Sequence, residues 1–291
     1  MSIDSTWLRC PNCFLPLSPA GDRTLGCESG HRYDLSRHGT VSLLPPRAPH
    51  TIGDSREMLE ARARLLGSGV FDPIADAIVT ASGDAASRTG DAALRVADLG
   101  CGTGYYASRL AEALPSAEFL AADRSPVAVR MAARAVPRST SVVLDLWRPL
   151  PLRDSAADLA INVFAPRNPR EFARVLRRDG VLVLVVPTAR HLGELRRVGG
   201  LLDIPAGKDA RVSAQLVSAG FSPSVAVRLE YSATVDAAQR AAIVGMGPSA
   251  HHTRAGGLAV SENSASDEPS QPSRVTVSVD VLAFLREPDS S

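Results

Sequence analysis

Three cysteines and one histidine near the N-terminus have the spacing of metal ligands. Two residues separate Cys10 from Cys13, and three residues separate Cys27 from His31. Thiolates and an imidazole in two close pairs suit a tetrahedral zinc ion, because each pair can bind from one tight turn. Four protein ligands leave no open coordination position, so the pattern predicts a structural zinc site. A redox pair at Cys10 and Cys13 is a weaker interpretation, since no βαβ pattern surrounds these residues.

A glycine-rich loop is the second group of residues that could do chemistry. Gly100, Gly102 and Gly104 follow the strand-like segment 95–99 and precede a helical pattern. Glycines in that position let the backbone approach a ligand at the carboxyl edge of a sheet. Tyr105 stands where a dinucleotide-binding fingerprint has its last glycine, and this argues against NAD.

The acidic residues around this loop favour a different cofactor. Asp98 directly precedes the loop, and Asp123 ends the next strand, at about the distance where an acid hydrogen-bonds ribose hydroxyls. Together with the glycines they predict S-adenosylmethionine as the cofactor, and the arrangement resembles the class I methyltransferases over residues 95–187. Asp145 ends the third strand and either faces the adenine amino group or caps a turn. Cys101 is expected to fill the bend of the loop.

Composition limits the remaining interpretations. The 291 residues suffice for an α/β domain and a smaller module. The 32 basic and 31 acidic residues nearly balance, so net charge does not indicate nucleic-acid binding. No apolar stretch approaches the ~20 residues of a membrane span. Only Cys101 lies outside the metal pattern, which is typical of a reducing compartment, so we expect a cytoplasmic protein.

Strand-like and helix-like segments alternate through the second half of the chain. This alternation predicts parallel βαβ units, and hence an α/β fold with a Rossmann-like, S-adenosylmethionine-dependent methyltransferase domain and an N-terminal zinc-binding module. We expect a zinc-binding, RNA-recognition module at 1–50, a connector of two helices at 51–91 and the methyltransferase domain at 92–291, with a mobile loop between 245 and 273. The expected strands are 95–99, 118–122, 142–146, 158–164, 181–186, 224–231 and 274–284, and the helices of the second domain are 105–114, 126–136, 169–176 and 210–218.

Several short segments, taken in order along the chain, carry a more specific resemblance. They are Cys10, Cys13, Cys27, His31, Tyr33–Asp34, His38–Gly39, Val41, Leu43–Leu44, Gly53–Ser55, Met58, Ala61–Arg62, Gly69, Phe71, Pro73, Asp98–Tyr106, Ala165–Pro166 and Arg190–Leu192. Together they resemble one family, the 23S ribosomal RNA (guanine-N1)-methyltransferases. The resemblance spans nearly the whole chain, although arginines replace common lysines and residues 256–272 do not align. It implies that the zinc module and the methyltransferase domain form a cleft for an RNA hairpin. It also implies cofactor contacts from Phe71, Cys101, Gly102 and His191.

The chemistry at guanine N1 suggests where a target base would sit. N1 lies on the Watson–Crick edge, so the base must be unpaired or flipped, and its N1 proton must be removed. Such enzymes usually hold the base at the end of the fourth strand, where Phe164 could stack and Asn162 could bond an edge. Burial of Phe164 and capping by Asn162 are equally good interpretations. Asp54 is a third catalytic candidate, although capping of a helix by Asp54 or Ser55 explains it better.

An arginine-rich stretch is the candidate surface for the RNA backbone, with a solvated helix face as the alternative. Its members are Arg167, Arg170, Arg174, Arg177, Arg178, Arg190, Arg196 and Arg197.

The resemblance further favours guanine 748 of the 23S rRNA as the target, with guanine 745 as the other candidate, and resistance to mycinamicin- or tylosin-type macrolides. It also allows a homodimer. Two rivals stay open: a methyltransferase that acts on a small molecule and carries a structural zinc, and a zinc-containing RNA-binding factor with an inert cofactor fold. The intact set Asp98, Gly100, Gly102, Gly104 and Asp123 argues against the second rival.

Overall fold

A computed structural model describes residues 3–45, 54–88, 93–197, 201, 203–205, 207–246 and 272–288. Within these residues, two β-sheets and eight α-helices follow one another along the chain. The N-terminal elements are a short 3-10 helix (Ser5–Trp7), β1 (Ser18–Pro19), β2 (Thr24–Gly26), β3 (Arg32–Asp34) and β4 (Val41–Ser42). The remaining elements are α1 (Arg56–Leu66), α2 (Asp72–Arg88), β5 (Arg95–Leu99), α3 (Tyr105–Ala113), β6 (Glu118–Asp123), α4 (Pro126–Ala135), β7 (Thr140–Val143), β8 (Ala157–Val163), α5 (Pro169–Val175), β9 (Leu176–Pro187), α6 (Gly193–Arg197), α7 (Lys208–Val217), β10 (Phe221–Val235), α8 (Ala237–Gly245) and β11 (Ser273–Arg286).

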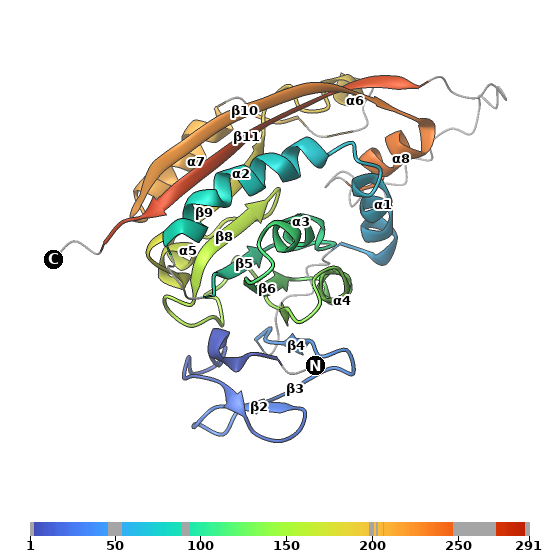
Figure 1. Cartoon of the computed structure of the whole chain (residues 1–291). Coiled ribbons are helices and arrows are strands. Elements are labelled where there is room, and N and C mark those ends of the chain that lie inside the picture. The colour runs from blue at the N-terminus through green and yellow to red at the C-terminus, as the bar shows by residue number, and fades with distance from the viewer. Residues whose placement is uncertain are drawn as a thin grey trace.

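The large sheet has the strand order β10-β11-β9-β8-β5-β6-β7-β4. Strands β4 to β9 pair in parallel, whereas β11 lies antiparallel between β9 and β10. The long β10 and β11 form a curved ribbon across one end of the molecule, with α2 beside it (Figure 1). The strand order changes direction between β5 and β8, and open α/β sheets bind ligands at such a point.

Both faces of the sheet are covered, because successive side chains of a strand point to opposite faces. Val96 of β5 packs in the apolar cluster that contains residues of α2 and α3. Its neighbour Ala97 packs in the other cluster, with residues of α5 and α7. Near-continuous burial of β7 and β8 is the pattern of strands that are covered on both faces.

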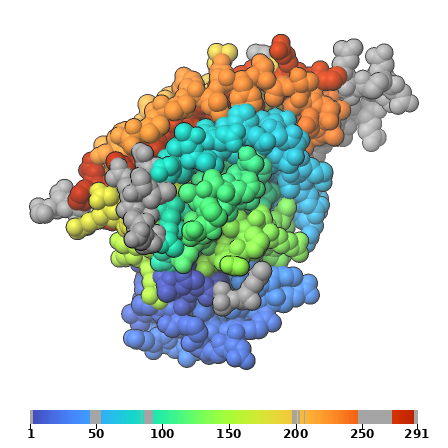
Figure 2. All heavy atoms as spheres, in the orientation of Figure 1, coloured from blue at the N-terminus to red at the C-terminus, as the bar shows by residue number. Residues whose placement is uncertain are grey.

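The N-terminal module does not form a core of its own. Trp7 and Leu17 belong to the same apolar cluster as Leu144 and Leu152 of the large domain. The strand β4 extends the large sheet by pairing with β7. Figure 2 shows the module, in blue, packed against one end of the molecule, opposite the β10–β11 ribbon. Folding of the module is therefore tied to that of the sheet.

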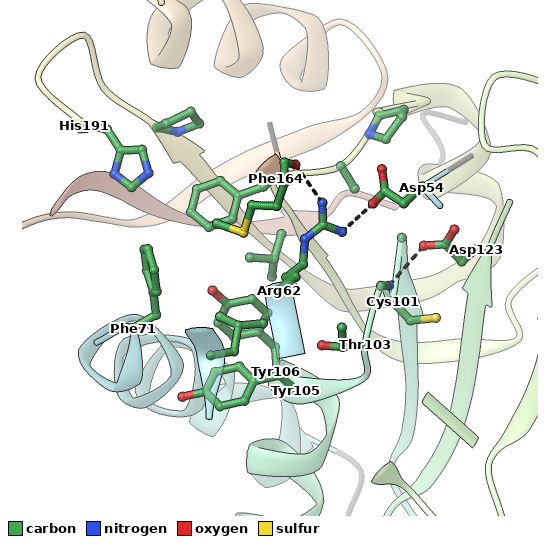
Figure 3. A pocket seen from close by; sticks show the side chains of 18 of the residues that line it. Asp54, Arg62, Phe71, Cys101, Thr103, Tyr105, Tyr106, Asp123, Phe164 and His191 are labelled. Atoms are coloured by element: carbon green, nitrogen blue, oxygen red, sulfur yellow. Dashed lines mark hydrogen bonds and ion pairs between the residues drawn. The ribbon is translucent and has the colours of Figure 1, made fainter. Parts of the chain in front are cut away.

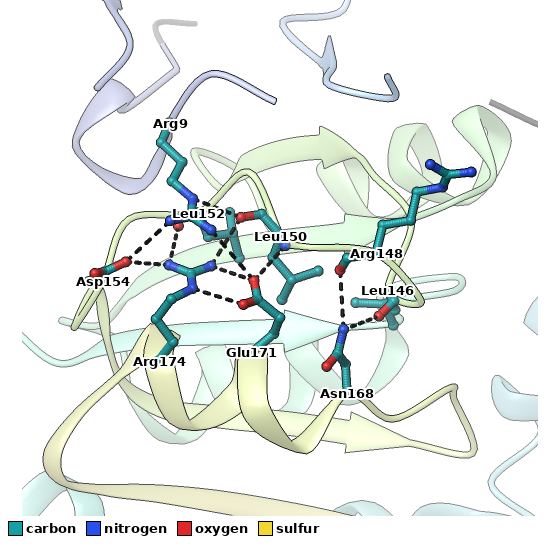
Figure 4. A network of polar contacts seen from close by, with 9 residues as sticks. All are labelled: Arg9, Leu146, Arg148, Leu150, Leu152, Asp154, Asn168, Glu171 and Arg174. Atoms are coloured by element: carbon teal, nitrogen blue, oxygen red, sulfur yellow. Dashed lines mark hydrogen bonds and ion pairs between the residues drawn. The ribbon is translucent and has the colours of Figure 1, made fainter. Parts of the chain in front are cut away.

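A group of charged side chains reinforces this junction (Figure 4). Arg9, next to the first cysteine of the metal pattern, donates to the carbonyl of Leu150 at 3.0 Å. Arg174 of α5 donates to the same carbonyl at 3.0 Å and to that of Leu152 at 2.8 Å. Glu171 forms ion pairs with both arginines and accepts the Leu150 amide at 2.6 Å. This Arg9–Glu171–Arg174 cluster fixes the loop after β7 to the N-terminal module.

Most of the expected elements are present within one or two residues of the predicted bounds. The exceptions are instructive. β7 ends at Val143 and not at 146, because the carboxylate of Asp145 accepts the Trp147 amide and turns the chain. β9 begins at Leu176 and β10 extends to Val235, beyond the predicted ranges. The short α6 and α8 were not predicted.

Some predictions fall on residues outside the described ranges. These are the domain boundaries at 50/51 and 91/92, the side chain of Arg197 and most of the loop expected at 245–273. Among the described residues, no helix combines the length and apolar character that a membrane crossing requires.

Candidate active site

A cavity of about 710 Å³ opens at the carboxyl ends of the parallel strands. It is lined by the glycine loop after β5, by Asp123 at the end of β6, by Asp145 and Trp147 after β7 and by Phe164 after β8. Side chains from α1 and from the loop after β9 close it from the other side (Figure 3). Ten of the cavity's side chains are labelled there, and they come from elements that are far apart in the sequence.

The glycine loop has the conformation that its sequence predicts. Gly100, Gly102 and Gly104 all have positive φ angles. A Cβ on Gly100 would lie 2.3 Å from the Cβ of Ala165, so packing alone excludes a side chain there. A Cβ on Gly102 would meet only the Arg62 guanidinium, at 3.6 Å, and Gly102 lines the cavity. The absence of a side chain at Gly102 thus leaves room for a ligand, whereas the absence of a side chain at Gly100 leaves room for the side chain of Ala165.

Two carboxylates lie beside the loop. Asp123 accepts the Gly102 amide at 3.0 Å and the Ser125 amide at 2.8 Å, and it faces the cavity. Burial raises the pKa of Asp123, while these two amide hydrogen bonds lower it. Asp98 is only 3 % exposed, and burial together with the nearby charge of Asp123 raises its pKa to about 8. Unlike Asp123, Asp98 is not among the residues that line the cavity.

Asp145 combines the two roles that the sequence left open. One carboxylate oxygen accepts the Trp147 amide at 3.1 Å, as in a turn cap. The other oxygen pairs with Arg124, and more distantly with Arg148 at 3.7 Å. Asp145 nevertheless lines the cavity, so it can also face a ligand.

An aromatic group lies on the far side of the cavity. Phe164 is 42 % exposed although β8 before it is buried, and its φ of 52° turns the ring outward. The rings of Phe164 and His191 stack with centroids 5.7 Å apart and an interplanar angle of 25°. Phe71 approaches His191 from below, at 6.4 Å. A non-glycine residue in a left-handed conformation costs ~1–3 kcal/mol, which is typical of functional sites.

His191 is held in one protonation state. It is 8 % exposed, and burial with the charge of Arg196 lowers its pKa to about 4. Its Nδ1 accepts the amide of Ser278, at 3.3 Å, from strand β11. The neutral imidazole therefore carries its proton on Nε2. This contribution from Ser278 was not predictable, because a sequence pattern does not determine which residues pair across a separation of 87 residues.

The other two catalytic candidates are placed differently. Asn162 is 1 % exposed and is not among the residues that line the cavity. Its amide nitrogen donates to the carbonyls of Leu99 and Pro166, which joins the two ligand loops. Asp54 lines the cavity and pairs with Arg62 at 2.5 Å. Ser55 and not Asp54 caps α1, since its hydroxyl accepts the Met58 amide.

The four metal-pattern residues come together as predicted. The ligand atoms of Cys10, Cys13, Cys27 and His31 all lie within 4.8 Å of one another. The Cys13–Cys27 sulfur distance is 3.6 Å, and the His31 Nδ1 lies 3.5 Å from Cys10 and 3.4 Å from Cys27. A tetrahedral zinc with ordinary bond lengths would give edges of roughly 3.8 Å and 3.6 Å, so the residues fit zinc closely.

Contacts around the thiolates favour the metal-binding form. A backbone hydrogen bond at Leu15 is the main cause that lowers the pKa of Cys13 to about 7. The Tyr33 hydroxyl lies 3.0 Å from the sulfur of Cys10, and a metal-bound thiolate there can only accept. Tyr33 was one of the residues that carried the resemblance, but the pattern did not assign it this position.

The arginine-rich stretch does not act as one surface. Arg174 belongs to the Arg9–Glu171–Arg174 cluster, Arg177 pairs with Asp158, and Arg190 pairs with Glu230. Arg170 is exposed outside the cavity, whereas Arg167 and Arg196 line it. The sequence also did not single out Lys208, which lines the same part of the cavity. Arg190, with a side chain that is 73% exposed, fits the solvated-face alternative, whereas the Arg174 side chain is only 20% exposed.

Comparisons with known proteins agree with this geometry. The family model described as "RlmA, N-terminal", a zinc ribbon, matches residues 8–50, and a methyltransferase-domain model matches residues 96–180. A protein of Streptomyces fradiae named 23S rRNA (guanine(748)-N1)-methyltransferase is 43% identical over 84% of this chain and 86% of its own. A proposed 23S rRNA (guanine-N1)-methyltransferase of Micromonospora griseorubida is 43% identical over 84% and 87%. A Bacillus subtilis (strain 168) protein with the same proposed activity is 34% identical over 81% and 83%.

The zinc ribbon, the S-adenosylmethionine-dependent methyltransferase domain and the predicted resemblance are therefore confirmed. On the identity and coverage of these relatives, the chain belongs to the family of 23S rRNA (guanine-N1)-methyltransferases.

Proposed function

We propose that this protein transfers the methyl group of S-adenosylmethionine to N1 of guanine 748 in a 23S rRNA hairpin. The observation that carries this proposal is the 43% identity to the Streptomyces fradiae enzyme, which is named for that nucleotide. The cavity supports it, because a cofactor loop and an exposed aromatic ring open into the same space. Guanine 745 is the alternative target.

The cofactor would occupy the half of the cavity at the glycine loop. Gly102 offers its open Cβ position to the ligand, and Asp123 would accept hydrogen bonds from ribose hydroxyls. Asp145 would lie near the adenine, whereas Asp98, which is not among the residues that line the cavity, would act through the glycine loop that it precedes. Phe71 and His191 would border the methionine end. When bound, the cofactor supplies an electrophilic methyl group.

The target guanine would occupy the half of the cavity at Phe164. An unpaired base can stack on an exposed aromatic ring, and such contacts are worth ~1–3 kcal/mol per base. His191 stacks on the Phe164 ring and keeps its Nε2 proton at neutral pH. It can therefore donate a hydrogen bond from Nε2. Its Nδ1 already accepts the Ser278 amide, so it cannot take the N1 proton of the guanine there. Asn162 would hold the loop and not the base edge. Asp54 stays the candidate acceptor of the N1 proton.

We infer three further properties from the proposed reaction. Methylation of a guanine in the drug-binding region of the ribosome would give resistance to mycinamicin- or tylosin-type macrolides. A ribosomal substrate would place the protein in the cytoplasm and require RNA binding. A homodimer is consistent with the resemblance, and sedimentation of the purified protein would decide it.

Reverse transcription across the 23S hairpin tests the main proposal. RNA from cells with and without the protein is compared, because an N1 methyl blocks base pairing and stops the polymerase. We expect a new stop at guanine 748 and a higher minimum inhibitory concentration of tylosin. Cells that express the Gly102→Val variant serve as the control and should show neither. A stop at 745 would correct the position.

The absence of any stop in 23S rRNA would overturn the assignment, provided that the purified protein binds the cofactor. That result would favour the rival reading of a methyltransferase that acts on a small molecule. Screening for cofactor consumption without RNA would then be the informative experiment.

A further inference from the structure

Positive side chains gather on one wall of the cavity, next to the aromatic ring. Arg167 follows Phe164 by three residues, and Lys208 begins α7, which packs against α5. Both line the cavity, and both are half-buried. Arg196 also lines the cavity, and the charges of Arg196 and Arg211 act on Lys208. We call Arg167 and Lys208 the cationic wall.

The cationic wall differs from the other arginines of the cavity in lacking acidic partners. Arg62 pairs with Asp54, and Arg124 pairs with Asp145. Among the residues that the structure describes, neither Arg167 nor Lys208 makes a hydrogen bond or an ion pair through its side chain. The acids closest to Lys208 in the chain act on other cations: Asp209 pairs with Arg228 at 3.9 Å, and the charge of Asp203 acts on Arg196.

This arrangement is unfavourable for the protein alone. Burial lowers the pKa of Arg167, and burial together with the charges of Arg167, Arg196 and Arg211 lowers the pKa of Lys208. The start of a helix also disfavours a cation, because the helix dipole is positive there. Charges that are partly removed from water without compensation indicate an anionic ligand that is absent from the free protein.

We propose that Arg167 and Lys208 bind the backbone phosphate of the nucleotide that enters the cavity, and thereby hold the guanine against Phe164. The inference rests on the proposed function, since it requires an RNA substrate. Arginine can donate two hydrogen bonds to a phosphate, and lysine adds a compact positive charge. The two side chains can therefore bind one phosphate together. This site assigns substrate contacts to the part of the cavity lined from the starts of α5 and α7.

The test compares Arg167→Gln and Lys208→Gln with Arg170→Gln. Arg170 of α5 follows Arg167 by three residues and serves as the control, because it is exposed and does not line the cavity. The probe is a synthetic 23S hairpin, and the readouts are its Kd by filter binding at several salt concentrations, KM and kcat for methyl transfer, and the Kd of S-adenosylmethionine. We expect the hairpin Kd and KM to rise about tenfold for each cavity variant, and at most about twofold for the control. The slope of log Kd against log salt should fall by about 0.7–0.9 for each lost contact.

Each other outcome would overturn the proposal in an identifiable way. Equal effects of Arg170→Gln and Arg167→Gln would show only general attraction of RNA. A weaker cofactor Kd with an unchanged hairpin Kd would assign the wall to the carboxylate of the cofactor. A fall in kcat at constant KM, with an activity profile shifted to higher pH, would show that the cationic wall stabilises the guanine after its N1 proton has left. Failure of the wild type to methylate the hairpin would reject the proposed function. The hairpin Kd values would still show whether the cationic wall binds RNA.

Discussion

The glycines of the cofactor loop have different structural roles, although they look equivalent in the sequence. Gly100 is required by its contact with Ala165, whereas Gly102 faces open space. The same contrast separates Asp98, which is buried and does not line the cavity, from Asp123, which lines the cavity and accepts two backbone amides. Substitutions at these positions should therefore separate stability from ligand binding.

Gly102→Ala should reduce cofactor affinity more than tenfold and destabilise the fold only by the cost of its left-handed conformation. The left-handed conformation costs alanine ~1–2 kcal/mol, and the added methyl occupies cavity space. Gly100→Ala should instead destabilise the fold by roughly 2–5 kcal/mol, because conformational strain and the contact with Ala165 add. Calorimetric titration with S-adenosylmethionine and thermal melts measure both quantities. Similar melting temperatures for the two variants would contradict this distinction.

Asp98→Asn should make the protein without cofactor more stable at pH 8 than the wild type. The pKa of Asp98 is raised from 3.8 to about 8 in the folded state, so the folded protein retains a proton that the unfolded chain has lost. Stability from this group is present below about pH 4 and is lost as the pH rises towards 8. Melting temperatures of both proteins from pH 5 to 8 should diverge in favour of the variant. Parallel curves of melting temperature against pH would show that burial does not raise the pKa of the Asp98 carboxyl.

At the scale of elements, the strands and helices that carry the glycine loop were predictable from local patterns. β5 and α3 begin at the predicted residues because apolar runs and glycines are local signals. The cavity wall that includes His191 was not predictable in the same way. Its geometry depends on β11, which pairs antiparallel between β9 and β10, and pairing partners are set by the whole sheet. The predicted parallel units therefore describe only the strands β5 to β9, and β4 joins them from the N-terminal module without having been predicted.

The loop after β7 should depend on the Arg9–Glu171–Arg174 cluster. Arg174→Met removes two carbonyl contacts and leaves Glu171 with one cationic partner fewer, and all three charged groups are at most 20% exposed in their side chains. We expect a loss of about 2–4 kcal/mol in the free energy of unfolding. Arg148→Met on the same loop is the control, with an expected loss below ~1 kcal/mol, because its side chain is 46% exposed. Urea denaturation measures both losses, and equal values would argue against the cluster.

For the whole molecule, the shared core makes the zinc site a part of global stability. Cys10 and Cys27 belong to the same apolar cluster as Leu144 and Phe172. Removal of zinc with a chelator should lower the melting temperature of the entire protein by more than ~5 °C, in one transition. Calorimetry of the zinc-loaded and zinc-stripped protein, with zinc content measured in parallel, tests this expectation. Two separate transitions, with the second unchanged, would indicate an independent module.

The position of β11 also determines when the enzyme can become active during its own synthesis. This strand follows every other strand of the sheet in chain order but lies inside it, and its Ser278 amide orients His191. A nascent chain that has emerged only as far as β10 would lack the strand on which β10 pairs, and its cavity wall would be unfinished. The ribosome that makes this protein must therefore release residues up to β11 before the new molecule can act on any ribosomal RNA.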